Sequence, residues 1–484
     1  MKLDIPTEVL EILKALQGAG FDAFVVGGSV RDLLMGKEPK DWDVATSAKP
    51  EAIQELFPDS FYTNEFGTVG VKTGSEDEHR AIVEITTFRT EESYSDKRHP
   101  DKVSFTTSLD EDLARRDFTV NAMALAADGS VRDPFEGQAD LEKKVLRAVG
   151  TANERFNEDA LRLMRAVRFA TVLGFALEER TYEALKKNAR LIDAIANERI
   201  RDELIKILES ERAHEGVELL REAGLLERIL PEVTAGVDVT QNKHHIYSVY
   251  EHNLRSLQWA AENDYALVVR IAALLHDVGK PQTKRGEGPS ATFYGHDVVG
   301  ARIARKALER LHFPRETVEK VAMLIRYHMF YYDIGEVTER SVRRLLANVG
   351  KENMDDLVKV RICDRMGSGV PKPEPYRLRH FQYMVEKVQN DPISVGMLKV
   401  RGDDIMAELD IEPGPKVGQV LAVLLEDVLD EPERNTKEYL LKRADELGKL
   451  SDKELAAMRQ EAKKKQQEVE EREQGKIKKR YYVE

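Results

Sequence analysis

The chain is poor in cysteine and tryptophan, with one cysteine and two tryptophans among 484 residues. The single thiol, Cys363, excludes an internal disulfide framework and any zinc site built from several thiolates. No apolar run approaches the roughly 20 residues of a membrane span, and the first residues are acidic and amphipathic, unlike a leader peptide. These absences predict a protein of the reducing cytoplasm with no membrane partner.

Basic residues are also fewer than acidic ones: the chain has 74 lysines and arginines and 87 aspartates and glutamates, and its formal net charge is −13. This balance argues against a protein that coats nucleic acid through its overall charge. A local groove of lysine and arginine remains compatible with it, because phosphate contacts depend on where basic side chains gather. The length allows about three domains.

Short strand-like runs alternate with helical segments up to about residue 150, and the later pattern is almost entirely helical. We therefore expect an α+β protein with a small mixed sheet near its N-terminus. The expected parts are a mixed α/β head at 1–150, a helical neck at 151–215, a helical body at 216–370 and a helical tail at 371–484. The charge-dense stretch after residue 451 is expected to be a solvated terminal helix.

A glycine pair and two aspartates lie close together in the head. Gly27 and Gly28 follow an apolar run, and residues without Cβ atoms let backbone N–H groups approach an anion. We expect Asp41 and Asp43 in the next strand, where residues two apart point to one face and a hard cation such as Mg²⁺ offsets their repulsion. A turn before an unrelated acidic strand end would give the same residues. The combination favours metal-assisted nucleotidyl transfer.

A third acid stands in residues 81–86, which alternate like a half-buried strand. Glu84 lies there among β-branched residues, where an unpaired carboxylate is costly to bury. We expect it to join Asp41 and Asp43 in the catalytic set, although an exposed strand edge would also tolerate it. With three acids, one metal ion activates the attacking hydroxyl and another neutralises the triphosphate that contains the leaving group.

Basic residues suited to a nucleotide follow in the segment 115–122. Arg116 offers paired donors that fit phosphate oxygens, and Asn121 offers an amide for a sugar. A salt-bridged start of a helix would explain this segment equally well.

Three arginines recur at three-residue spacing in the segment 158–169. On a helix, Arg162, Arg165 and Arg168 share one broad face, and Asp159 lies three residues before the first of them. The spacing places Asp159 close enough to fix the Arg162 guanidinium, and such a pair presents donors and acceptors to a base. An ordinary salt-bridged helix face is the alternative.

Taken together and in order, these segments resemble the bacterial class II tRNA nucleotidyltransferases, the CCA-adding enzymes, with the bacterial poly(A) polymerases as close relatives. The resemblance implies that Asp41 and Asp43 bind Mg²⁺ and that the substrates are CTP, ATP and the 3′ acceptor end of tRNA. It implies that Asp159 and Arg162 form a protein template for the two nucleotides. The expected nucleotide-binding residues are Gly28, Ser29, Arg31, Arg116, Asp117, Asn121, Asp159, Arg162, Arg165 and Arg168.

Two segments favour full CCA addition within that family. Residues 89–105 resemble the flexible loop of members that add the terminal A, and residues 57–71 suit the tRNA enzymes better than the poly(A) polymerases. An enzyme that adds only A, a poly(A) polymerase and a non-catalytic RNA-binding protein remain alternatives.

A second group of candidate ligands lies in the body. A histidine and an aspartate end an apolar helical run, with a further histidine upstream and an aspartate downstream, and without thiolates such a set suits Mn²⁺, Fe, Ni²⁺, Co²⁺ or Mg²⁺. The set resembles the HD-domain phosphohydrolases, which implies a metal site and action on 2′,3′-cyclic phosphate ends. A purely structural HD unit is the alternative. The minimal ligands are His252, His276, Asp277 and Asp364, and His296 and His328 match the additional histidines of two-metal members.

Overall fold

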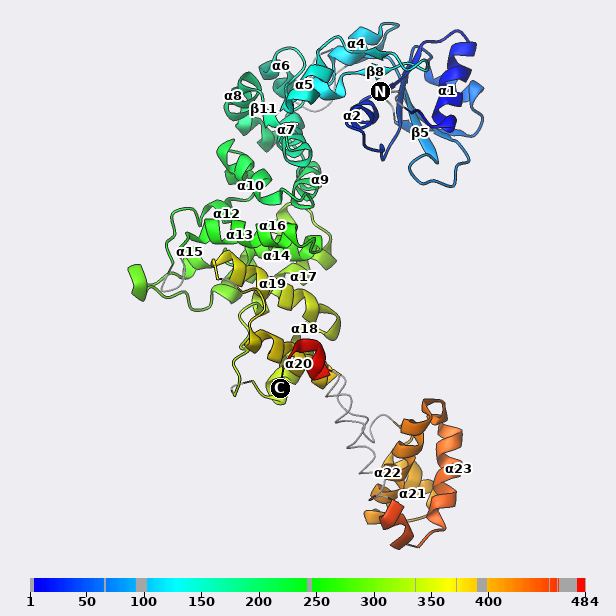
Figure 1. Ribbon diagram of the computed structural model, residues 1–484, viewed down its shortest axis with the longest axis vertical. Coiled ribbons are helices and arrows are strands. Elements are labelled where there is room, and N and C mark those ends of the chain that lie inside the picture. The colour runs from blue at the N-terminus through cyan, green and yellow to red at the C-terminus, as the bar shows by residue number, and fades with distance from the viewer. Residues whose placement is uncertain are drawn as a thin grey trace. The chain divides into compact units, whose positions relative to one another are not determined.

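The structure is a computed structural model that describes residues 4–64, 67–92, 102–241, 246–335, 337–370, 372–389, 398–451, 453–458, 460 and 477–483. It divides into two compact units, residues 1–329 with 356–371 and residues 330–355 with 372–484 (Figure 1). The expected α+β architecture is confirmed, because a mixed sheet is followed by helices. The four-part division of the chain stays a prediction.

The head is built on a seven-stranded sheet (Figure 1). Its order is β3 (Ser60–Asn64), β4 (Thr68–Lys72), β5 (Ile82–Thr87), β2 (Asp43–Thr46), β1 (Ala23–Val26), β8 (Ala124–Leu125) and β9 (Val131–Arg132). Strands β1, β2, β4 and β5 are short, and their buried valine, isoleucine and alanine side chains form the core together with helix α1 (Thr7–Gly18). Because β2 runs parallel to β5, Asp43 lies directly beside Glu84 in the ladder.

Smaller elements complete the head. Strands β6 (Arg89–Glu92) and β7 (Lys102–Phe105) pair as a separate two-stranded ladder, and residues 93–101 of the expected loop lie outside the described residues. Strands β10 (Val145–Leu146) and β11 (Ala176–Leu177) form a parallel pair. The helices are α2 (Gly28–Leu34), α3 (Pro50–Leu56), α4 (Leu109–Ala114) and α5 (Gly137–Lys143).

Helices continue the first unit after the head. The first of these helices are α6 (Ala152–Glu158), α7 (Leu161–Leu173), α8 (Glu179–Asn188), α9 (Asn197–Leu208), α10 (Ala213–Glu222), α11 (Leu226–Ile229) and α12 (Pro231–Thr234). The next group is α13 (Val249–Glu262), α14 (Leu267–Leu275), α15 (Lys280–Thr283), α16 (His296–Arg310), α17 (Arg315–Tyr327) and α19 (Met354–Gly367). A capping box of Ser248 and Glu251 begins α13, which fixes where His252 enters the helix.

The second unit is helical in its described part. Its helices are α18 (Glu339–Val349), α20 (Tyr376–Gln389), α21 (Gly402–Leu409), α22 (Pro415–Asp430) and α23 (Lys437–Gly448). The last three pack through a leucine- and valine-rich core of their own. Most of the expected charged terminal helix lies outside the described residues. In the described part of the chain, no helix is long and apolar enough to cross a membrane.

Candidate active site and candidate metal centre

The carboxylates of the head meet at the start of β2. Ser29, near the start of α2, donates its hydroxyl to the Asp41 carbonyl at 2.9 Å and accepts from the Asp43 backbone N–H at 3.3 Å. Sequence reasoning expected Asp41 inside the strand, but β2 begins at Asp43 and Asp41 lies exposed in the preceding bend. The Ser29 hydroxyl therefore fixes a bend that pure strand alternation does not describe.

Gly27 allows the backbone to come close to the Asp43 carboxylate for two reasons. Its φ is +75°, and an added Cβ would lie 3.0 Å from Arg116 Nη1 and 3.5 Å from Asp43 Oδ2. A side chain here would be strained and would press on the charged groups. The glycine pair thus allows the start of α2, the Arg116 guanidinium and the Asp43 carboxylate to approach one another.

The electrostatics of Asp43 fit a cation site. Burial raises the pKa of Asp43 to about 6, the Arg116 guanidinium opposes this rise, and the charges of Glu84 and Asp41 add to it. Glu84 and Asp41 are therefore both within electrostatic range of the Asp43 carboxylate. Oxygen ligands that repel one another are the donor set that a hard divalent cation favours.

We expect Asp43→Asn to stabilise the protein when divalent ions are chelated. The raised pKa means that the folded state disfavours the ionised carboxylate, so ionisation opposes folding at every pH above the ordinary pKa of 3.8. The gain in free energy of unfolding is about 1–3 kcal/mol at neutral pH. The gain shrinks as the pH falls from about 6 to 3.8, because the folded wild type then binds a proton on Asp43 that the unfolded chain does not yet bind. Urea unfolding in EDTA at neutral pH and near pH 5 measures both values, and equal stability at neutral pH would contradict the argument.

A chain of hydrogen bonds links the nucleotide-binding candidates. Arg31 donates through Nη1 to Asn121 Oδ1 at 2.7 Å, and Asn121 donates through Nδ2 to Asp117 Oδ1 at 3.2 Å. Asp117 Oδ2 accepts from Arg165 Nε at 2.8 Å and from its Nη2 at 2.5 Å. Burial alone would raise the pKa of Asp117, but Arg165 lowers it to about 2. The structure therefore joins these four candidates in one ionised network.

Sequence reasoning missed Asp112, which organises the arginine pair beside this network. Its fully buried carboxylate accepts from Arg115 Nε at 2.9 Å and from Arg116 Nη2 at 3.3 Å. The signal was available, because Asp112 stands three and four residues before the two arginines. Arg116 thus lies between Asp112 and Asp43, and its described contacts do not include Asn121.

The expected Asp159–Arg162 contact is replaced by a Glu158–Arg162 pair. Arg162 donates to Glu158 Oε2 at 2.5 Å and to the Arg115 carbonyl at 2.9 Å, whereas Asp159 accepts from the Leu161 backbone N–H at 2.9 Å. The expectation assumed one continuous helix. Asp159 instead has an extended backbone between α6 and α7, so helical three-residue spacing does not apply to it.

Arg168 is held by two residues that sequence reasoning also missed. Its Nε lies 2.6 Å from Glu203 Oε2, and its guanidinium carbon lies 3.9 Å from the centre of the Phe169 ring. Glu203 is buried in α9, 35 residues from its partner, so no local spacing signals the pair.

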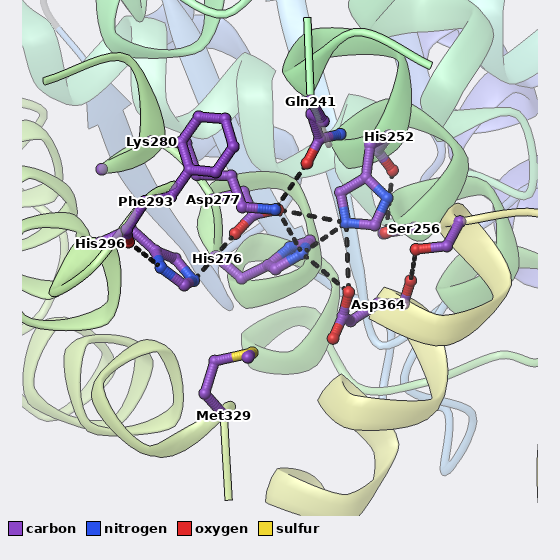
Figure 2. A network of polar contacts seen from close by, with 12 residues as sticks. Gln241, His252, Ser256, His276, Asp277, Lys280, Phe293, His296, Met329 and Asp364 are labelled. Carbon is purple, nitrogen blue, oxygen red and sulfur yellow. Dashed lines mark hydrogen bonds and ion pairs between the residues drawn. The ribbon is translucent and has the colours of Figure 1, made fainter. Parts of the chain in front are cut away.

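The histidine and aspartate candidates of the body converge (Figure 2). Three of the histidines are oriented in the same way: Nδ1 of His276, His296 and His328 faces the carbonyl three residues earlier, at 2.9, 2.8 and 2.6 Å. Because a carbonyl only accepts, Nδ1 carries a proton in each of these rings, so in the neutral form of the ring Nε2 has a lone pair that can bind an ion. Burial lowers the pKa of His328 to about 3, which keeps this ring neutral.

Asp277 stands at the centre of this histidine–aspartate cluster. Its Oδ2 lies 3.3 Å from His252 Nε2 and 3.4 Å from His276 Nε2, and its Oδ1 lies 3.4 Å from His296 Nε2 and 3.9 Å from His328 Nε2. The two carboxylate oxygens thus face two different histidine pairs. Both pairs form candidate metal triads with Asp277, one on each side of its carboxylate.

Two further acid–base contacts complete the cluster. Asp364 Oδ1 lies 3.3 Å from His252 Nε2, which joins it to the first triad. Lys280, which sequence reasoning missed, places Nζ 2.5 Å from Asp277 Oδ2 and donates to Gln241 Oε1 at 2.6 Å (Figure 2). Burial would raise the pKa of Asp277, but Lys280 and the histidines hold it well below its usual range. All six candidate ligands are therefore brought together, around an ionised aspartate.

Three family models match successive parts of the chain. "Poly A polymerase head domain" matches residues 23–147, "Probable RNA and SrmB- binding site of polymerase A" matches residues 174–236, and "HD domain" matches residues 249–366. The first contains the carboxylates of the head. The third contains every residue of the histidine–aspartate cluster described above, apart from Gln241.

Curated relatives match somewhat less than half of the chain. The chain is 49% identical over 205 residues to a CCA-adding enzyme of Lactobacillus delbrueckii subsp. bulgaricus, which is 42% of this chain and 50% of that protein. It is 49% identical over 229 residues to a CCA-adding enzyme of Lactococcus lactis subsp. cremoris, 46% of this chain and 56% of that protein. The chain thus spans about half the length of the curated relatives it matches.

A solved structure is similar over nearly the whole chain. The Bacillus stearothermophilus CCA-adding enzyme in complex with CTP is 30% identical, with a TM-score of 0.57. The similarity covers 91% of this chain and 96% of that one.

Proposed function

Because the chain belongs to the class II CCA-adding enzyme family with a C-terminal HD domain, we propose that it adds C, C and A to the 3′ end of tRNA, using CTP and ATP. The observation that carries this proposal is the position of Asp43 and Glu84 side by side on β2 and β5, next to Arg116. Asp41 lies within electrostatic range of the same pair. Acids that take up a metal thus stand beside a basic group suited to phosphate.

The residues present fit divalent metal ions, and we propose Mg²⁺ held by Asp41 and Asp43, with Glu84 as the third catalytic acid. Burial is the main cause of the raised pKa of Asp43, and the charges of Glu84 and Asp41 add to it; a bound cation would offset these effects. When bound, such ions would supply charge stabilisation for the leaving pyrophosphate and lower the pKa of the attacking hydroxyl. Ser29 holds the bend that carries both aspartates.

The arginine network supports recognition of a nucleotide. Arg31, Asn121, Asp117 and Arg165 form one continuous chain of hydrogen bonds, which fixes their donors before any ligand arrives. We propose that this network holds the incoming CTP or ATP and that Asp159 with Arg162 contributes the template for the base. Recognition of tRNA is proposed to rest on shape and phosphate contacts at the acceptor end. The single buried cysteine supports a cytoplasmic location.

Incubation with tRNA that lacks its three terminal nucleotides tests the activity. With Mg²⁺ and CTP alone we expect two added residues, and with CTP and ATP together we expect three residues followed by a stop. A long A tail would favour a poly(A) polymerase instead. Addition of A only, to tRNA already ending in CC, would favour an A-adding enzyme, and no incorporation would overturn the proposal.

A second activity is proposed for the histidine–aspartate cluster, namely metal-dependent hydrolysis of phosphate esters such as 2′,3′-cyclic ends. Its support is the shared Asp277 carboxylate, whose two oxygens face the Nε2 atoms of two separate histidine pairs. Neutral imidazoles and carboxylates suit Mn²⁺, Fe, Ni²⁺, Co²⁺ or Mg²⁺. The two activities use different residues of the first unit, so each can be removed alone.

A further inference from the structure

We infer that Phe169 is a positioning residue for the nucleotide: its ring is the common platform on which three arginines of the proposed nucleotide site are set. The guanidinium carbons of Arg168, Arg165 and Arg31 lie 3.9, 5.3 and 5.4 Å from the centre of this one ring. All three fall within the roughly 6 Å over which an aromatic face attracts a cation. The inference rests on the proposed nucleotidyl transfer and deepens it.

The ring is wedged between the two segments that carry the network. Phe169 belongs to α7, is 8% exposed, and packs edge-on against Phe118 with ring centres 5.8 Å apart. Phe118 directly follows Asp117 and lies three residues before Asn121. The position of the ring is therefore fixed by the same backbone segment whose side chains bind Arg31 and Arg165.

The three guanidinium groups repel one another, so a group that attracts all of them is needed to keep them together. The pKa of Arg168 is lowered to about 10, mainly by burial and also by the charges of Arg165 and Arg31, while Glu203 opposes the change. Three guanidinium groups near one another would separate if only their own acids held them, because each acid contacts a different arginine. The negative face of one ring attracts all three at once and adds no charge to the site.

The consequence concerns binding of the nucleotide more than the reaction step. Arg31 and Arg165 are the two ends of the hydrogen-bonded chain through Asn121 and Asp117. Without the ring, both ends lose one of the contacts that aim them, and an incoming nucleotide must then order them itself. The carboxylates around Asp43 do not touch the ring, so transfer from a bound nucleotide should continue.

Two substitutions in the full-length chain separate this role from simple packing. Phe169→Leu keeps an apolar side chain but removes the aromatic face, whereas Phe169→Tyr keeps the face. The matched control is Phe175→Leu, because Phe175 is 6% exposed, follows the same helix, and has no guanidinium over its ring among the described contacts. Urea unfolding first establishes how far each leucine variant is destabilised.

Calorimetric titration of CTP and steady-state incorporation kinetics then give the result. For Phe169→Leu we expect CTP binding about tenfold weaker, the equivalent of about 1.4 kcal/mol, with a matching rise in KM for CTP and ATP and kcat within about threefold. Phe169→Tyr and Phe175→Leu should bind CTP within about twofold of wild type. Equal weakening in both leucine variants, or no rescue by tyrosine, would overturn the inference. Absence of CTP binding by the wild type would instead overturn the proposed function.

Discussion

Incorporation of C and A into tRNA is expected to fall at least about a thousandfold in Asp41→Asn and in Asp43→Asn, because several kcal/mol of charge stabilisation depend on the metal ions these acids hold. Each substitution keeps the size of the side chain and removes one negative charge. Binding of tRNA should remain within about twofold of wild type, since acids do not supply its phosphate contacts. Single-turnover incorporation and filter binding of the same tRNA measure the two quantities.

Stability cannot explain such a loss. The pKa of Asp43 is raised to about 6, so Asp43→Asn is expected to be more stable than wild type without metal while being inactive. Asp128→Asn is the matched control in the head, because Asp128 is exposed and bonds only within its own turn to Ser130. Activity close to wild type in either Asp41→Asn or Asp43→Asn would remove the metal-site argument.

The parts of the head site that sequence could predict depend on local geometry. Glu84 was expected from strand alternation, and the parallel pairing of β2 and β5 sets it directly beside Asp43. Gly27 was expected from its lack of a Cβ, and its positive φ and its closeness to Arg116 agree. The face on which Glu84 lies follows from strand alternation, and the need for glycine at residue 27 follows from its backbone conformation. A sequence pattern indicates both of these.

Other parts depend on where helices end and on distant pairs. Sequence spacing predicted a contact between Asp159 and Arg162 because it could not show that the chain leaves the helix at Asp159. As a result of this break, Arg162 contacts Glu158 instead. Glu203 pairs with an arginine of another helix, which no local period predicts. Lys280 stands three residues after Asp277, at a spacing that allows an ion pair. A pattern of metal ligands does not include it, because an ammonium group does not bind a cation.

The second large effect is expected at the histidine–aspartate cluster. Asp277→Asn should weaken divalent-metal binding at this cluster by at least about a hundredfold and end hydrolysis of 2′,3′-cyclic AMP, because both candidate triads use the Asp277 carboxylate. Incorporation of C and A should be unchanged, since the carboxylates of the head lie on other elements. Titration calorimetry with Mn²⁺, using Asp41→Asn as the background to silence the head site, reports metal binding directly.

The ion pair between Lys280 and Asp277 makes a further control necessary in this experiment. Asp277→Asn leaves the Lys280 ammonium, 2.5 Å away in wild type, buried without its counter-charge, which costs about 3–5 kcal/mol of stability. The double variant Asp277→Asn with Lys280→Met removes both charges, so it should recover most of that stability and still bind no metal at the cluster. Asp238→Asn, at an exposed carboxylate of the same unit, is the matched single control. Metal binding or hydrolysis retained in the stable double variant would show that Asp277 does not hold the ion.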